Sequence, residues 1–306
     1  MKCGYVSIVG RPNVGKSTLL NDLIGEKLAI TSNVSGTTRN IINGIYNDKD
    51  SQIIFIDTPG VHKPHNQLEK IMNRKSYNNF DDVDVILFMI DAKSGFGKGD
   101  IFILDRIKDK DIPIIVLLNK IDLIKDKEVL LKEIDKIKEE YDFAEIIPIS
   151  AGKNNLYDLI KSIKKYLPES EKVFDDDEMT NVSLKFMMAE YVREKLLLLT
   201  HDEIPHTVSC YCEEYVDNGN SVDIKVLIVV ERDNLKKIII GKNGSMLKEV
   251  GIEARKDMEK FLGKKVYLET YVKTLKNWRD ETKYLKELGL DLDEDNWYWW
   301  NSIKWD

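Results

Sequence analysis

Eight residues near the start of the chain have the types and the spacing of a phosphate-binding loop. They read Gly-Arg-Pro-Asn-Val-Gly-Lys-Ser at 10–17, which is the pattern G-x-x-x-x-G-K-S. In this pattern Lys16 reaches the β- and γ-phosphates of a nucleotide, and the hydroxyl of Ser17 binds Mg²⁺. The predicted phosphate contacts are Gly10, Arg11, Pro12, Asn13, Val14, Gly15, Lys16, Ser17 and Thr18.

A second cluster, Asp57-Thr58-Pro59-Gly60, follows an apolar run and completes the phosphate side of the site. A carboxylate at this position can hold Mg²⁺, usually through water. The N–H of Gly60 can contact a γ-phosphate and so sense its presence. We therefore expect all four residues to line the nucleotide site.

The loop between these two clusters reads Gly-Thr-Thr-Arg at 36–39. A threonine there can complete the Mg²⁺ shell while a γ-phosphate is present and be released after hydrolysis. We favour Thr38 over Thr37 for this role. The predicted Mg²⁺ ligands are Ser17, Thr38 and Asp57, and the predicted catalytic groups are Lys16, Thr38 and Gly60.

Base selectivity is predicted from Asn119-Lys120-Ile121-Asp122. An ionised carboxylate only accepts hydrogen bonds, so Asp122 suits guanine, whose N1 and N2 offer two adjacent donors. Adenine offers no such pair of donors, so this residue argues against an ATPase. The aliphatic part of Lys120 can lie over the base, and Asn119 can tie this segment to the phosphate-binding loop. After the last apolar run of this half, Ser150-Ala151 can offer a backbone N–H to guanine O6.

Each of these clusters lies at an end of an expected strand. Residues 1–168 alternate apolar runs with helical patterns, which predicts an α/β fold whose mostly parallel sheet is covered on both faces. Such sheets bind ligands beyond the carboxyl ends of their strands. The expected strands are 6–9, 41–46, 53–57, 83–91, 114–119 and 146–149, and the expected helices are 18–24, 68–78, 100–109, 127–141 and 155–166.

The composition changes after residue 168. Residues 169–182 are acidic and poor in core residues, so we expect a linker there. An α+β domain is expected over 183–280, followed by an aromatic and acidic tail, 281–306. The domain's expected elements are a helix at 183–200, strands at 206–215 and 221–231, helices at 234–239 and 245–261, and a strand at 265–272.

A glycine turn, Gly241-Lys242-Asn243-Gly244, lies between two helices of this second domain. G-x-x-G turns bring the backbone close to single-stranded nucleic acid. Residues 232–279 hold 13 Lys and Arg against 6 Asp and Glu, although the whole chain has a net charge of −7, so a directed contact with phosphates is expected. The predicted RNA contacts are Lys237, Ile240, Gly241, Lys242, Asn243, Gly244, Lys248 and Arg255.

The bulk composition favours a cytosolic protein. No apolar run approaches the roughly 18 residues of a membrane span, and the chain runs from Met1 straight into a strand, so we expect neither a transmembrane segment nor a signal peptide. An odd number of cysteines, Cys3, Cys210 and Cys212, indicates reduced thiols. The two neighbouring cysteines are expected to pack on a strand.

The nucleotide clusters, in this order, resemble the translation-factor-related GTPases of the Ras-like superfold. The resemblance implies a Ras-like P-loop G domain that binds GTP or GDP with Mg²⁺ and hydrolyses GTP. Val61 stands where many such GTPases carry the glutamine that orients the attacking water. In the subgroup with an apolar residue there, the asparagine equivalent to Asn13 is associated with a bound K⁺, and Arg39 is an alternative source of positive charge.

The second domain resembles a type II KH domain, and the combination resembles the Era family over residues 3–290. The sequences that carry this resemblance are Ile-Gly-Lys-Asn-Gly at 240–244 and Gly-Ile-Glu-Ala-Arg-Lys-Asp-Met at 251–258. Era membership implies a GTPase that binds the 3′ end of 16S rRNA in assembly of the small (30S) ribosomal subunit. It also implies a monomer in the cytoplasm with peripheral contact at the inner face of the cell membrane.

Two other classes stay open. A GTPase of tRNA modification shares the G-domain clusters, and an RNA-binding module could use its nucleotide as a structural element. The last 16 residues depart from the Era pattern because they hold four of the five tryptophans. We expect this part of the tail to pack onto the KH domain or onto a partner.

Overall fold

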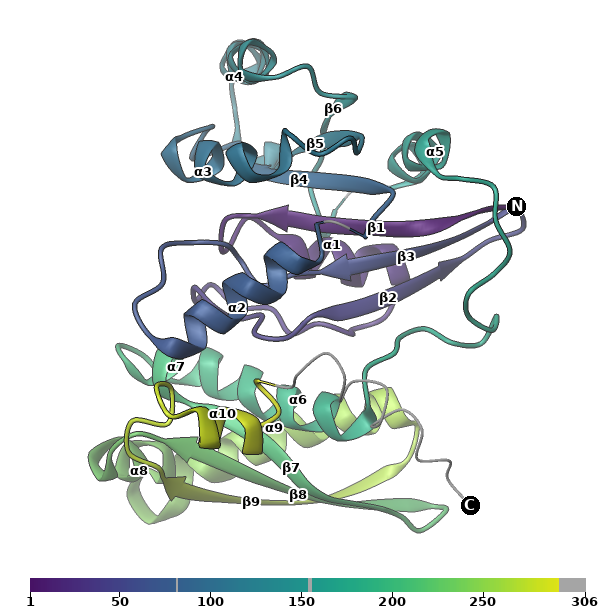
Figure 1. Cartoon of the computed structure of the whole chain (residues 1–306). Coiled ribbons are helices and arrows are strands. Elements are labelled where there is room, and N and C mark those ends of the chain that lie inside the picture. The colour runs from purple at the N-terminus through teal and green to yellow at the C-terminus, as the bar shows by residue number, and fades with distance from the viewer. Residues whose placement is uncertain (81, 154–155, 292–306) are drawn as a thin grey trace. The chain divides into compact units, whose positions relative to one another are not determined.

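The computed structural model describes residues 1–80, 82–153 and 156–291. The chain forms two compact units, which Figure 1 shows together with the labels of their elements. The first unit comprises Met1–Lys63 and Met72–Val182, and the second comprises Pro64–Ile71 and Ser183–Asp306. Among the described residues, no helix has the length and the apolar character needed to cross a membrane.

Six strands form one sheet in the first unit, in the order β2-β3-β1-β4-β5-β6. β2 pairs with β3 antiparallel, and the other neighbouring strands pair parallel. The expectation of a mostly parallel sheet is therefore confirmed. The strands are β1 (Lys2–Gly10), β2 (Ile42–Asn47), β3 (Ser51–Asp57), β4 (Val85–Asp91), β5 (Ile114–Asn119) and β6 (Glu145–Pro148).

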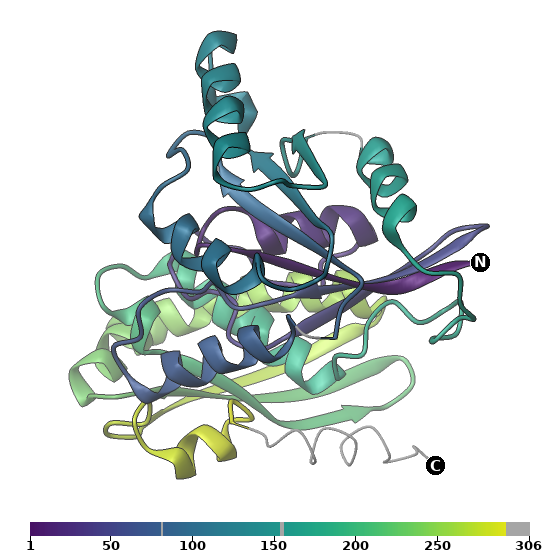
Figure 2. The ribbon, with the colours of Figure 1, turned by 45° about the horizontal axis from the view of Figure 1, so that its top comes forward.

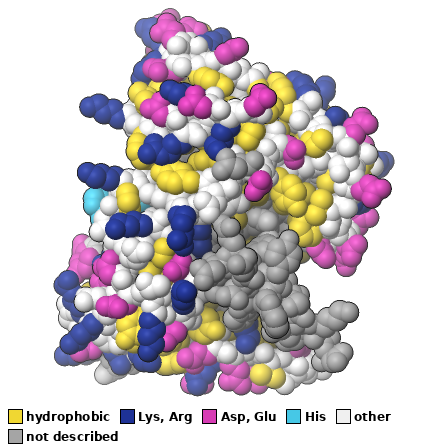
Figure 3. Space-filling view, viewed as in Figure 1, with side chains coloured by type: hydrophobic (Ala, Val, Ile, Leu, Met, Phe, Trp, Pro, Cys, Tyr) yellow, Lys and Arg dark blue, Asp and Glu magenta, His cyan; other side chains and the backbone are white. Residues whose placement is uncertain are grey.

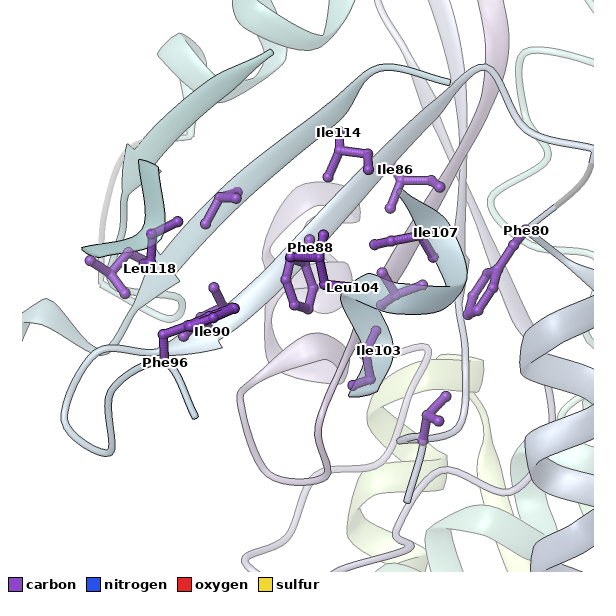
Figure 4. Packing of buried hydrophobic residues seen from close by; sticks show 14 of the residues in the cluster. Phe80, Ile86, Phe88, Ile90, Phe96, Ile103, Leu104, Ile107, Ile114 and Leu118 are labelled. Atoms are coloured by element: carbon purple, nitrogen blue, oxygen red, sulfur yellow. The ribbon is translucent and has the colours of Figure 1, made fainter. Parts of the chain in front are cut away.

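Helices cover this sheet because its strands are apolar on both faces. On one face Phe88 of β4 packs in a cluster with residues of α3 and α4, and the alternate residues of β4 are also fully buried. Figures 1 and 2 show α4 beside β5, and Figure 4 shows Phe88 among its neighbours. The helices are α1 (Lys16–Ile24), α2 (Gln67–Asn78), α3 (Lys98–Ile107), the 3₁₀ turn η1 (Ile121–Leu123), α4 (Lys127–Glu140) and α5 (Tyr157–Tyr166).

The second unit is a three-stranded sheet with helices. Its order is β7-β8-β9, in which β8 pairs antiparallel with β7 and parallel with β9. The helix, strand and turn order expected of a type II KH domain is present. The elements are α6 (Leu184–Leu199), α7 (Ile204–Thr207), β7 (Ser209–Asp217), β8 (Ser221–Val230), α8 (Asp233–Ile240), the 3₁₀ turn η2 (Lys242–Gly244), α9 (Ser245–Leu262), β9 (Lys265–Thr274) and α10 (Thr282–Glu287).

Two short helices were not expected from the sequence. α7 occupies the first residues of the expected strand 206–215, because Pro205 suits the first turn of a helix. α10 lies within the segment assigned to the tail, and its Leu285 is fully buried. The Trp-rich part of the tail lies outside the described residues.

The acidic segment 169–182 belongs to the first unit and is hydrogen-bonded to its strands β2 and β3. The N–H of Ile45 on β2 donates to Met179 O over 2.9 Å, and Thr180 Oγ1 donates to Asn43 O over 2.6 Å. On β3, Gln52 Oε1 accepts the N–H of Phe174 over 3.0 Å. The segment therefore runs along the outer edge of β2, the strand that ends this side of the sheet.

Phe88→Ala should lower the free energy of unfolding by about 3–5 kcal/mol, because it leaves a cavity in the closed cluster of the first unit. Phe102→Ala is the matched control, since that ring lies on α3 and is 37% exposed, and it should cost about 1 kcal/mol or less. Guanidinium unfolding followed by circular dichroism measures both. Equal losses from the two variants would contradict this assignment of the core.

Candidate guanine-nucleotide and RNA sites

The phosphate-binding loop joins β1 to α1, as the motif requires. Gly15 precedes α1 with a φ of 109°, and a Cβ there would lie 2.4 Å from Asn119 Nδ2, so only glycine fits. Lys16 follows it, and its ammonium donates to Gly10 O over 3.1 Å and to Arg11 O over 3.0 Å. The loop thus curls around the ammonium group that is expected to meet the phosphates.

Lys16 and Asp57 are both buried charges. Burial lowers the pKa of Lys16 to about 8, although attraction to Asp57 opposes this. Burial raises the pKa of Asp57 to about 6, against the opposing effects of Lys16 and of hydrogen bonds from Ser17 and Thr38. Perturbed titratable groups of this kind cluster at functional sites.

Three side-chain oxygens converge where Mg²⁺ is expected. Ser17 Oγ lies 2.7 Å from Asp57 Oδ2 and 2.8 Å from Thr38 Oγ1. The second carboxylate oxygen, Asp57 Oδ1, is buried and has no hydrogen-bond partner among the described residues. Hydroxyl and carboxylate oxygens are ligands that Mg²⁺ prefers, and an unpaired buried carboxylate oxygen can accept from the water that such ions keep, so these residues fit the ion.

The two threonines of the 36–39 loop point in different directions. Thr38 Oγ1 faces Ser17 and also lies 3.5 Å from Asp57 Oδ2. Thr37 Oγ1 donates to Val34 O over 2.6 Å, within its own loop. The geometry therefore supports Thr38 as the candidate metal ligand.

Asn119 joins three parts of the site. Its Nδ2 donates to Val14 O over 2.7 Å, and its Oδ1 accepts the N–H of Ala151 over 2.9 Å. The expected tie between the base-binding segment and the phosphate-binding loop is present. The N–H of Ala151 is engaged by Asn119 here, so its expected contact with guanine O6 stays a prediction.

Lys120 and Asp122 are both held by neighbouring groups. The ammonium of Lys120 donates to Asn13 O and to Asp91 Oδ2, each over 2.7 Å. Asp122 accepts from Ser150 Oγ and, over 2.6 Å, from the ammonium of Lys153. The hydrogen bond from Lys153 lowers the pKa of Asp122 most, and the hydrogen bond from Ser150 lowers it further. The carboxylate therefore stays ionised, which is the form that accepts hydrogen bonds from a base.

Asn13 reaches the loop that contains the candidate threonines. Its backbone is left-handed, with a φ of 63°, and its Nδ2 donates to Asn33 O over 2.8 Å. Val61 is buried in the apolar cluster of the first unit, and Arg39 is also buried.

Several contacts at this site were not anticipated from the sequence. Asp91 could have been found, because it ends β4 as Asp57 ends β3 and Asn119 ends β5. The contacts of Asn33 and Lys153 had no such signal, since each depends on how two loops fold against each other.

The candidate RNA-binding turn is well exposed in the second unit. Gly241 and Gly244 have φ values of 73° and 76° and connect α8 to α9 through η2. Ile240, Gly241 and Gly244 are half-buried, and the exposed predicted contacts are Lys237, Lys242, Asn243, Lys248 and Arg255. The face of the molecule in Figure 3 mixes acidic and basic side chains, so no single sign of charge covers it.

Two apolar side chains on the helices that flank this turn are exposed, and neither was anticipated from the sequence. Ile238 on α8 is 51% exposed and Ile252 on α9 is 38% exposed. Both lie on helices whose other faces are buried, and helical periodicity alone does not show which isoleucine faces solvent.

Mg²⁺ binding should weaken as the pH falls through about 6, the raised pKa of Asp57. Below that pH a proton occupies the carboxyl and competes with the ion, so apparent affinity should fall by about tenfold per pH unit. Above pH 7 the carboxyl is ionised and the affinity should level off. Mg²⁺ titrations with a fluorescent GDP analogue measure this.

Asp57→Asn supplies the control for this pH series. Its remaining pH dependence reports the phosphates of the nucleotide alone. An identical profile in the variant and in the unaltered protein would show that Asp57 is not the titrating ligand.

Family models match both units of the chain. Residues 5–120 match the family described as 50S ribosome-binding GTPase, and residues 203–279 match the KH domain. The chain is 45% identical over 293 residues to GTPase Era of Lacticaseibacillus paracasei, covering 95% of this chain and 97% of that protein. It is 44% identical over 295 residues to GTPase Era of Lactobacillus delbrueckii subsp. bulgaricus, covering 96% and 97% respectively.

Two crystal structures of Era match the whole architecture. Each has a TM-score of 0.93 and 44% sequence identity, and each alignment covers 95% of this chain and all of the other. One is a variant of Aquifex aeolicus Era bound to GDP and AlF4⁻. The other is Era in complex with MgGDPNP and nucleotides 1506–1542 of 16S ribosomal RNA. With the same two domains in the same order at this identity, the chain belongs to the Era family of GTPases.

Proposed function

We propose that this GTPase is a nucleotide-controlled RNA-binding switch that acts in assembly of the small (30S) ribosomal subunit. It binds the 3′ end of 16S rRNA through its KH domain and hydrolyses GTP in its G domain. The observation that carries the proposal is the Era complex with MgGDPNP and 16S rRNA nucleotides, to which this chain is 44% identical.

We assign the proposed activities to four consecutive parts of the chain. Residues 1–168 bind and hydrolyse GTP, 169–182 connect the domains, 183–280 bind RNA, and 281–306 form the tail. We place the activity in a cytoplasmic monomer that makes peripheral contact with the inner face of the cell membrane.

The phosphate end of the site works through electrostatics. Backbone N–H groups of residues 13–18 and the ammonium of Lys16 supply positive charge at the β- and γ-phosphates. Phosphate charge favours the ammonium form, so binding should raise the pKa of Lys16 from about 8. Ser17, Thr38 and Asp57 hold Mg²⁺, which neutralises charge on the phosphate oxygens when bound.

The switch depends on two contacts made only while the γ-phosphate is present. Thr38 and the N–H of Gly60 hold the two loops that follow α1 and β3 against the phosphate and its ion, and hydrolysis releases them. Val61 has no polar group with which to orient the attacking water. We therefore propose that a second cation, in addition to Mg²⁺, assists hydrolysis.

K⁺ is the cation that Asn13 supports. Its amide lies within hydrogen-bond reach of the carbonyl of Asn33, and both can present neutral oxygens. Positive charge there would stabilise the charge that develops on the phosphates.

RNA binding should depend on the nucleotide and on the glycine turn. A fluorescent oligonucleotide of the 16S rRNA 3′ end should bind more tightly with GDPNP than with GDP in an anisotropy titration.

In the same titration, Lys242→Glu should weaken RNA binding by about tenfold or more, because it reverses a charge beside the RNA backbone. Lys138→Glu, an exposed change on α4, is the control and should bind within about twofold of the unaltered protein.

Two results would count against the proposed function. Equal affinity with GDP and GDPNP would remove the switch. Full affinity in Lys242→Glu would remove the glycine turn from the RNA site.

Replacing K⁺ with Na⁺ should lower kcat for GTP by about tenfold or more. Asn13→Ala should turn over slowly in both salts, because it lacks the amide oxygen. Asn33→Ala keeps its backbone carbonyl and should retain the response to K⁺. A phosphate-release assay measures all three proteins, and equal rates for the unaltered protein in the two salts would exclude this role for Asn13.

A further inference from the structure

The side chain of Arg11, within the phosphate-binding loop, is held by the loop that leads into α3. Its Nε donates to Asp100 Oδ1 over 2.9 Å. Its Nη2 donates to Ser94 Oγ over 3.0 Å and to Gly95 O over 3.1 Å. The guanidinium is thus fixed at three points, all within a single loop and the first turn of the helix that follows.

Asp100 is the buried partner in this arrangement. Its side chain is fully buried, whereas 29% of the Arg11 side chain is exposed. The other carboxylate oxygen, Oδ2, accepts the N–H of Gly97 over 3.0 Å and so caps the start of α3. A buried carboxylate is costly without a charged partner, and Arg11 is that partner.

The two segments approach each other closely. A Cβ on Gly99 would lie 2.7 Å from Arg11 Cδ, so a larger residue at the start of α3 would displace the arginine side chain from its present position. This proximity limits the positions that the Arg11 side chain can take.

Arg11 connects this contact directly to Lys16. Its side chain is fixed by Asp100, and its own carbonyl oxygen accepts from the Lys16 ammonium over 3.0 Å. Asp91, at the end of β4, provides a second contact with the phosphate-binding loop, because it binds Lys120, which donates to Asn13 O. The segment 91–100 therefore supports the phosphate-binding loop at Arg11 directly and at Asn13 through Lys120.

We propose that Asp100 is a positioning residue of the nucleotide site. Through Arg11 it holds the carbonyl that aims the Lys16 ammonium at the β- and γ-phosphates. The inference rests on the proposed nucleotide site and deepens it, since it assigns a function to a residue of α3, a helix outside the predicted nucleotide contacts.

Asp100→Asn isolates this role. Asparagine has nearly the same size and keeps an oxygen for the N–H of Gly97, but it lacks the charge that holds Arg11. A fluorescent GDP analogue should dissociate about tenfold faster from this variant, which is the size of one charge-assisted hydrogen bond. The KM for GTP should rise by a similar factor and kcat should change less, because the contact shapes the site before the switch loops close.

Two variants of α3 serve as controls. Asp105→Asn removes an exposed ion pair with Lys108, and Ile103→Val loosens the buried face of the helix. Both should release the analogue at the rate of the unaltered protein, even where Ile103→Val lowers the thermal midpoint. Arg11→Ala should match Asp100→Asn, and the double variant should be no faster than Arg11→Ala alone.

The outcomes separate this inference from the proposed function. Unchanged release from Asp100→Asn, or equal acceleration in Ile103→Val, would overturn the positioning role while the GTPase assignment stands. Failure of the unaltered protein to bind the analogue would overturn both.

Discussion

The burial of two opposite charges, Lys16 and Asp57, is the constraint on which the nucleotide site depends. Burial favours the neutral form of each group, and it outweighs their mutual attraction, so the pKa of Lys16 is lowered to about 8 and that of Asp57 is raised to about 6. A buried polar atom without a partner costs about 1–3 kcal/mol, and Asp57 Oδ1 has none among the described residues. The folded chain thus carries an electrostatic cost that a phosphate and its metal ion would relieve, which couples ligand binding to stability.

The parallel sheet brings the groups of this site together without long-range adjustment. In the register of the strands, Ile8 lies opposite Asp57, and Asp91 lies opposite Asn119. Polar residues at the carboxyl ends of β3, β4 and β5 therefore meet at one edge, where the phosphate-binding loop leaves β1. The side chains then link neighbouring loops, so that a shift in one loop is transmitted to the others.

The sequence was sufficient for the long helices, for the strands and for most of the polar residues at this edge of the sheet. Apolar runs and helical periodicity reflect which side of each element is buried, and both can be read locally in the sequence. The parallel sheet and the order of helices and strands in the KH domain could therefore be predicted. Thr38 could be favoured over Thr37 from the sequence, but only the folded loop shows that Thr38 Oγ1 faces Ser17 and Thr37 Oγ1 faces Val34 O. The pairing of Arg11 with Asp100 spans 89 positions of the chain, and no spacing rule predicts such a contact.

The segment 169–182 has a consequence for the solubility of the isolated G domain. It lies on the open side of β2, where Met179 and Thr180 occupy backbone groups of Ile45 and Asn43. Unpaired strand edges recruit strands of other molecules, and acidic residues beside an edge repel a second copy. A fragment that stops at residue 168 would lose both the covering segment and its negative charge. Intermolecular sheet extension would then compete with the monomer, so a workable boundary for that domain lies beyond Thr180.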